Sequence, residues 1–235
     1  MIRETGGELA YKLTIVCLAN SRKLKGRCVA GLQLRGANLG PWIRPVIPSG
    51  KGELFAERLY AGWKDPQLLD LIEIAFLQPR PIACHQEDHL INSAEKWVRK
   101  GSVDREFLNP GLEEVRGHLW FDGGSTSNGL NDRIPAEVAE QLRSSLKLIQ
   151  PKSITMRVQT EGAYFGKPKK KVRGLFSIAG HSYIFSVTDP VIEAEFKNAP
   201  EGAERIVVDP ILCISLSEVF EEQNACFKLI AGVLE

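Results

Sequence analysis

Short apolar segments, many of them alternating with polar residues, recur along this 235-residue chain between glycine and proline turns. An alternation of period two is typical of strands that bury one face. A first group of such segments lies at residues 11–18, 27–34, 42–48 and 68–77. A second group lies at residues 146–160, 173–178, 181–188, 206–216 and 225–234, with Ala179 and Gly180 as a tight hairpin turn. The pattern predicts a mainly β protein built of small barrels.

The segment between the two groups has a different character. Residues 93–100 begin with Ser93, a candidate N-cap, and residues 134–142 place Pro135 in a first helical turn. A polar loop rich in Gly, Ser and Asn lies between these two predicted helices. We therefore predict a first barrel over residues 1–82, a helical and loop insert over residues 83–143, and a second barrel over residues 144–235.

Charge is distributed unevenly, although the net charge is only +1. Between Leu9 and Gly52 there are eight basic side chains and no Asp or Glu, whereas from Val191 onward nine acidic residues accompany three basic ones. Because the two ends cancel, the net charge does not argue against a polyanionic partner. A region of one sign on strands and their loops can attract a phosphate backbone.

The bulk composition predicts an ordered cytoplasmic protein. Hydrophobic residues make up 43% of the chain and charged residues 25%, which is ordinary for a globular protein. Five cysteines without a CxxC pair argue against a disulfide framework and favour a reducing compartment. The first ten residues lack the features of a secretory signal, and no apolar stretch approaches the roughly 20 residues that span a bilayer. We expect no membrane partner.

Several motifs along the chain resemble those of a known family. The motifs are LTIVCLANSRK, GRCVAG, WIRPV, LLDLIEI, NGLNDR, FSVTDP, CISL and FKLIAGVLE, and they extend over nearly the whole sequence. In this order they resemble the bacterial dual OB-fold domain family. The resemblance implies two tandem OB-like barrels of five strands each. It also implies a nucleic-acid-binding or nucleotide-sensing role in bacterial conflict or phage-defence systems, and it carries over no catalytic residue.

The first predicted hairpin is the best candidate surface for nucleic acid. It carries four cations, Arg22, Lys23, Lys25 and Arg27, and such side chains neutralise phosphates. Asn20 and Ser21 beside them can hydrogen-bond phosphate or sugar oxygens. The alternative interpretation is a solvated turn.

On the following strand, Trp42 and Arg44 are two residues apart and share a face. There they can stack a base and bind a phosphate. The alternative is that Trp42 packs into the barrel while Arg44 reaches out along the rim.

A second basic run occupies residues 166–173 in the second group of strands. It contains Lys167, Lys169, Lys170, Lys171 and Arg173. As a loop of an OB barrel, such a run can close over a single strand through contacts to the backbone. The alternative is a solvated hairpin tip.

The polar loop offers secondary contacts through Asn128, Asn131 and Arg133, whose side chains can bind a base edge or a ribose. Asn128-Gly129 is also a standard turn dipeptide, and Asn131 with Asp132 can cap the helix that follows. We favour this structural interpretation of the loop.

No metal, cofactor or catalytic site is predicted. Cys84, His85 and His89 are three possible ligands within six residues, but the sequence offers no second cluster to complete a four-ligand zinc site. The chain has no phosphate-binding GxxxxGK[ST] motif, no GxSxG elbow and no HExxH motif. We therefore expect a protein that is not an enzyme.

We predict a recognition module that binds single-stranded or unpaired DNA or RNA through its phosphate backbone, with an affinity that falls steeply with salt. It would serve as an accessory component of a bacterial defence system. Two alternatives stay open. One is a protein-interaction subunit that docks through the acidic C-terminal region, and the other is a small-nucleotide sensor with a pocket between the barrels.

Overall fold

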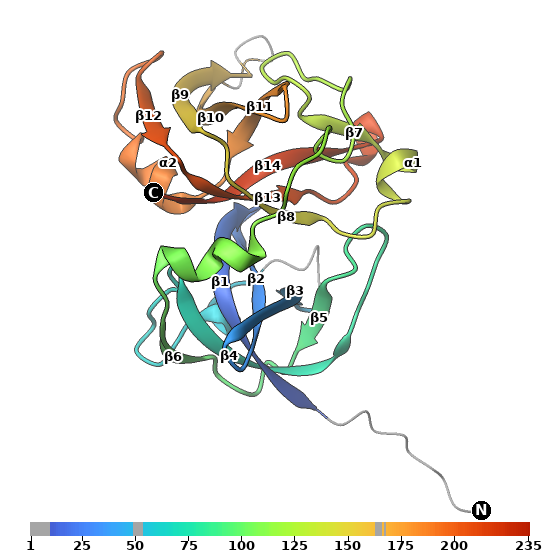
Figure 1. The fold of residues 1–235 in the computed structure, drawn as a ribbon, viewed down its shortest axis with the longest axis vertical. Helices are drawn as coiled ribbons and strands as arrows, with labels where there is room; N and C mark the ends of the chain where they lie inside the picture. The colour runs from blue at the N-terminus through green and yellow to red at the C-terminus, as the bar shows by residue number, and fades with distance from the viewer. Residues whose placement is uncertain (1–9, 49–53, 163–165, 167) are drawn as a thin grey trace, which may run out of the picture.

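Two β-barrels lie one above the other in the computed structural model, which describes residues 10–48, 54–162, 166 and 168–235 (Figure 1). The predicted mainly β fold with two tandem barrels is confirmed. Among the described residues, no helix is long and apolar enough to cross a membrane.

The first barrel is a ring of five strands: β1 (Tyr11–Lys23), β2 (Gly26–Arg35), β3 (Asn38–Val46), β4 (Asp70–Pro79) and β5 (Asp88–Ile91). The ring runs β1-β2-β3-β5-β4 and returns to β1. β1 closes it because residues 11–16 pair with β4 while residues 15–23 pair with β2. The β3–β5 pair is parallel and the other four are antiparallel. A small closed barrel of this kind is an OB-type architecture.

The second barrel repeats this plan with an interrupted first strand. Its strands are β8 (Leu146–Ile149), β9 (Ser153–Glu161), β10 (Lys169–Ile178), β11 (His181–Val187), β13 (Ile211–Leu216) and β14 (Ala225–Leu234). β8 pairs with β13 and β9 pairs with β10, so together they take the position of β1. Pro151 lies in the break between β8 and β9 and has no N–H to donate to a ladder. β12 (Glu204–Val208) adds an edge to β9.

The segment expected to be a helical insert contributes three short strands to the two sheets and is otherwise mostly loops and turns. Both β5 and β6 (Val98–Ser102) pair with β4, so the boundary expected at residue 82 cuts through the first barrel. The helix expected at residues 93–100 is a turn followed by a strand. Within residues 134–142 only the four-residue α1 (Ala136–Ala139) is helical, and β7 (Arg133–Pro135) pairs with β14 of the second barrel. Tertiary pairing here overrides local helix propensity.

Short helical turns complete the chain. These are η1 (Ala56–Arg58), η2 (Arg105–Gly111), η4 (Glu221–Gln223) and α2 (Pro190–Glu195). α2 begins where the Asp189 side chain accepts a hydrogen bond from the Val191 amide at 2.9 Å, an N-cap contact. The sequence Asp189-Pro190 therefore begins a helix directly after β11.

Both predicted hairpins form, but the first is longer than expected. Its turn is only Leu24 and Lys25, and Leu24 adopts a positive φ of 49°. The basic residues on either side therefore lie on strands and not in a polar turn. In the second hairpin, Ala179 and Gly180 have φ values of 50° and 81° and join β10 to β11, as the sequence predicted.

A third hydrophobic core joins the two barrels. Each barrel has its own interior cluster, and a further cluster combines Val16, Leu18 and Leu32 of the first barrel with Leu148 and Ile211 of the second. All five side chains are at most 5% exposed. Burial of this kind stabilises contacts by about 25 cal/mol per Å² of apolar surface, so the barrels are packed against each other as one body.

Candidate functional site

A cavity of about 570 Å³ opens where the end of β1 meets the second barrel. We call it the inter-barrel pocket. Six basic side chains from three strands line it: Arg22, Lys23, Lys169, Lys171, Arg173 and Lys228. A backbone hydrogen bond from Arg22 N–H to Thr188 O, 2.7 Å long, holds the end of β1 against the second barrel. The two basic segments that are distant in the sequence are therefore adjacent in space.

The alternation of side chains along β10 decides which of its cations reach the pocket. Lys169, Lys171 and Arg173 are two residues apart and share one face, which lines the cavity. Lys170 points to the opposite face, where its ammonium donates to Ala199 O at 2.9 Å. The expectation of one basic loop over residues 166–173 is corrected, because β10 begins at Lys169. Lys167 lies outside the described residues.

Most cations of the pocket are neutralised by acids. Arg22 donates to Glu193, with Nη2 2.6 Å from Oε1, and Lys23 Nζ lies 2.5 Å from Glu218 Oε1. Lys171 Nζ lies 2.9 Å from Glu161 Oε2. Among the residues that the structure describes, no carboxylate lies within ion-pairing distance of the exposed Lys169. The pocket therefore has little unpaired positive charge.

Arg173 is part of the floor of the pocket. Its side chain is 7% exposed and reaches Glu161 Oε1 at 2.6 Å and Asp132 Oδ2 at 3.2 Å. Burial works to raise the pKa of Glu161, but hydrogen bonds from Arg173 and Lys171 together hold it below the ordinary value. Because Arg173 is buried and paired with two carboxylates, the role expected for it as a free phosphate contact is corrected to a structural one.

Aromatic and amide side chains line the pocket beside these charges. Phe220 is 45% exposed, and its ring meets that of Phe227 edge-on at 5.7 Å between centroids. Asn128 and Gln223 also line the cavity. An exposed aromatic face can stack a base, and neighbouring amides can bind base edges.

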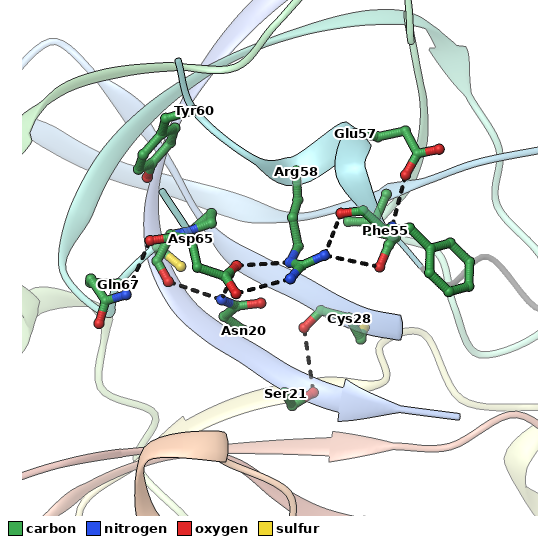
Figure 2. Close-up of polar contacts among 12 residues, drawn as sticks. Asn20, Ser21, Cys28, Phe55, Glu57, Arg58, Tyr60, Asp65 and Gln67 are labelled. Atoms are coloured by element: carbon green, nitrogen blue, oxygen red, sulfur yellow. Dashed lines mark hydrogen bonds and ion pairs between the residues drawn. The ribbon is translucent and has the colours of Figure 1, made fainter. Parts of the chain in front are cut away.

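The remaining cations of the first hairpin are elsewhere. Lys25 is exposed in the turn, and Arg27 lines a separate cavity of about 90 Å³. In Figure 2 the guanidinium of Arg58 and the amide of Asn20 both donate to Asp65, with Nε and Nδ2 at 2.8 Å and 2.9 Å from Oδ1. Asn20 is therefore engaged in a structural network beside this small cavity and does not face the inter-barrel pocket.

Trp42 and Arg44 do not form an exposed platform. The Trp42 ring is half-buried and packs against the core between the barrels. Arg44 is 3% exposed, with Nε 2.5 Å from Asp88 Oδ1 on the neighbouring β5. The expectation that Arg44 binds a phosphate or reaches the rim is corrected, because its charge is buried and already paired.

Some residues of the polar loop line the inter-barrel pocket, and others make hydrogen bonds that hold the loop in place. Asn128 lines the inter-barrel pocket, as do Thr126 and Ser127. The Asn131 amide instead donates to Ser182 O at 3.1 Å, and its oxygen accepts from Gly123 N–H at 2.9 Å. Arg133 pairs with Phe227 in the ladder between β7 and β14. Asn131 and Arg133 therefore have structural roles, but the helix cap expected from Asn131 and Asp132 is not formed, because α1 begins after Pro135 without a side-chain cap.

Two features of the pocket were not recognised in the sequence. Lys228 is a lone cation in an apolar strand, and burial lowers its pKa to about 8. Phe220 lies in an acidic stretch that gives no sign of an aromatic surface. The position of Lys228 in an otherwise apolar strand was the one available signal.

Cys84, His85 and His89, which the sequence analysis considered as possible zinc ligands, have separate partners in the structure. His85 is buried with Nδ1 3.0 Å from Ser145 Oγ, whereas His89 Nδ1 lies 2.5 Å from Tyr11 Oη. Cys84 packs in a small hydrophobic cluster with Cys226. Within the described part of the chain, these three side chains do not converge on a common point.

Comparison with known proteins places this architecture in a family. A search of curated proteins found no match. A family model described as the dual OB-containing domain matches residues 13–233, which include both barrels and the inter-barrel pocket. The chain belongs to the dual OB-containing domain family.

Proposed function

We propose that this chain recognises single-stranded nucleic acid by binding one or two nucleotides in the inter-barrel pocket. A phosphate would lie at Lys169 and Lys171, and a base would stack on Phe220. The observation that supports this most directly is the convergence of the basic face of β10 with an exposed aromatic ring in one cavity. OB folds commonly bind oligonucleotides.

The size of the cavity limits the ligand. Sites for small molecules typically measure about 300–1,000 Å³, and the inter-barrel pocket has about 570 Å³. This volume accommodates a nucleotide or two. Lys25 and Lys170 lie outside the lining, so they do not extend the pocket into a long basic track.

The charge pairing changes the expected salt dependence. Five cations of the described lining already have carboxylate partners, namely Arg22, Lys23, Lys171, Arg173 and Lys228. Among these described residues, Lys169 is therefore the cation that is free to neutralise a phosphate. For single strands, the logarithm of the binding constant falls with the logarithm of salt by about 0.7 per phosphate neutralised. One such contact gives a slope of about −0.7, which is shallower than the steep dependence expected from the sequence.

Fluorescence anisotropy with labelled DNA and RNA tetranucleotides tests the proposal. We expect Lys169→Ala to weaken binding about fivefold and Phe220→Ala to weaken it by the equivalent of about 1–3 kcal/mol, the usual value of stacking on an aromatic ring. Lys170→Ala is the matched control, because it removes the same charge from the opposite face of the same strand. Equal effects of Lys169→Ala and Lys170→Ala, or unchanged binding in Phe220→Ala, would contradict the proposal.

A free nucleotide is the second candidate ligand, because the enclosed volume suits a monomer as well as part of a strand. A thermal-shift screen with mononucleotides and cyclic nucleotides distinguishes the two, since stabilisation grows with ligand concentration relative to Kd. Stabilisation by a monomer at concentrations where a tetranucleotide has no effect would favour the sensor.

Protein docking through the acidic C-terminal region has less support. Glu193, Glu195, Glu204, Glu218 and Glu235 all form ion pairs within the chain. Their charge is thus partly neutralised before any partner binds.

We retain, as predictions, a recognition role without catalysis, a cytoplasmic location and a function in bacterial defence.

A further inference from the structure

Three potential metal ligands meet on the second barrel, at a site that the proposed function does not use. His118 and Asp122 lie in the chain before β7, and His181 is the first residue of β11. His118 Nδ1 lies 2.9 Å from Asp122 Oδ2, and His181 Nδ1 lies 3.2 Å from the same oxygen. One ligand atom from each residue lies within 4.8 Å of the other two.

These separations are those of ligands around one ion. Zinc binds imidazole nitrogen and carboxylate oxygen at about 2.0–2.2 Å, so two ligands in a tetrahedral shell are about 3.3 Å apart. The two imidazole-to-carboxylate distances lie close to that value. We propose that His118, Asp122 and His181 form a binding site for a divalent transition metal of the zinc class.

The donor set selects the metal. Two imidazoles and one carboxylate suit Zn²⁺ and related ions, whereas Ca²⁺ and Mg²⁺ prefer shells of oxygen. Three protein ligands leave a fourth position for water. The His118 side chain is 56% exposed, so an ion enters directly from solvent.

The surroundings orient the carboxylate. The Tyr183 hydroxyl donates to Asp122 Oδ2 at 3.1 Å, and the Lys228 ammonium lies 3.3 Å from Oδ1. Outer contacts of this kind hold metal ligands in place.

A bound ion would connect the chain segment around residues 118–122 to the start of β11. The existing connection includes the two His-to-Asp contacts, the Tyr183 hydrogen bond to Asp122 and edge-on packing of the two imidazoles, with ring centroids 4.3 Å apart. In the metal-bound form, coordination to the ion would take the place of the direct contact between each imidazole and the carboxylate. We therefore expect the ion to stabilise the second barrel. The site is independent of the proposed nucleotide site, although Lys228 lies beside both.

Titration of tag-free protein with Co²⁺ and Zn²⁺ tests the proposal. We expect one Co²⁺ per chain with visible absorption bands of a low-coordinate site, displacement by Zn²⁺, and a higher Tm in Zn²⁺. His118→Gln and His181→Gln should each weaken binding by at least about tenfold, since loss of even an outer contact typically costs 10–100-fold. The exposure of His118 makes its replacement compatible with the fold.

His89→Gln is the matched control, because His89 lies on β5 of the first barrel. It should leave the stoichiometry and the affinity unchanged. Absence of Co²⁺ binding at millimolar concentration, or equal affinities of wild type, His118→Gln and His181→Gln, would overturn the proposal. These outcomes concern the metal alone, so they leave the oligonucleotide experiment unaffected.

Discussion

Arg22 of the first barrel and Glu193 of α2 form a two-pronged ion pair across the junction of the barrels. Arg22 Nη2 lies 2.6 Å from Oε1, and Nε lies 2.9 Å from both carboxylate oxygens. Both side chains stay partly exposed, at 32% and 26%. The pair therefore holds Arg22 at the edge of the inter-barrel pocket while neutralising its charge.

Glu193→Gln should strengthen oligonucleotide binding. Without the carboxylate, Arg22 becomes available to a phosphate, and one added charge-assisted contact of about 1 kcal/mol corresponds to about fivefold in affinity. The loss of unfolding free energy should stay below about 1 kcal/mol, because the pair is partly exposed. Anisotropy measures the affinity. Glu204→Gln, which removes the same charge from a pair with Arg157 outside the pocket, should have no effect on binding.

Asp132→Ala should destabilise the second barrel strongly. The Asp132 carboxylate accepts hydrogen bonds from the amide and hydroxyl of Thr126, each at 2.7 Å, and from Arg173. Removing one member of a buried charged group leaves the others uncompensated and costs about 3–5 kcal/mol. Urea unfolding measures this loss. Glu204→Ala, at an exposed ion pair, should cost less than about 1 kcal/mol; equal losses would contradict the network.

Glu161 should make the free energy of unfolding depend on pH in the acidic range. Its pKa in the folded protein is lowered, because the hydrogen bonds from Arg173 and Lys171 outweigh the opposing effect of burial. Its stabilisation is therefore complete above the unfolded pKa of about 4.3 and is lost as the pH falls through the lower folded value. Unfolding curves at pH 7 should give wild type a clearly higher free energy of unfolding than Glu161→Gln, and this difference should shrink at pH 3. A difference that does not shrink at pH 3 would refute this assignment.

Gly232→Ala should weaken the contact between the barrels. A Cβ at Gly232 of β14 would lie 2.2 Å from the backbone oxygen of Leu18 of β1, a distance that neither strand can accommodate without moving. Crowding in a packed core typically costs about 1–3 kcal/mol. In Gly40→Ala the nearest atoms, at 3.1 Å and 3.2 Å, belong to the flexible Arg35 side chain, and the Gln33 backbone oxygen lies at 3.3 Å, so this control should cost much less than Gly232→Ala in thermal unfolding.

Strand positions were predictable where local pattern and tertiary pairing agree. Ala179-Gly180 turns the chain because both residues adopt positive φ, and the apolar alternation from Tyr11 onward does form β1. The helix expected at residues 93–100 failed because β4 offers an unpaired edge, and pairing with it outweighs the modest helix propensity of these residues. Nothing in the sequence of residues 93–100 indicates that an edge of β4 is available for pairing.

The candidate site was predictable as two basic segments but not as a pocket. Lys169 and Lys171 were recognised in the sequence as basic residues. Which side chains of this run face the pocket and which face away depends on where β10 begins, and the sequence did not show that. Arg44 was misassigned because its partner Asp88 lies 44 residues away in the chain. Glu161 and Phe220 gave no signal, since neither stands in a recognisable motif.

By itself the sequence determined the β-rich character, the division into two groups of strands and the two regions of positive charge, because these depend on periodicity, turn residues and composition. Only the tertiary structure decided which charges are available, since acids such as Glu193 and Glu218 reach Arg22 and Lys23 from distant segments through folding. The joining of β1 to the second barrel likewise depends on packing between residues remote in the chain. Local chemistry therefore specified the elements, and long-range pairing specified the site.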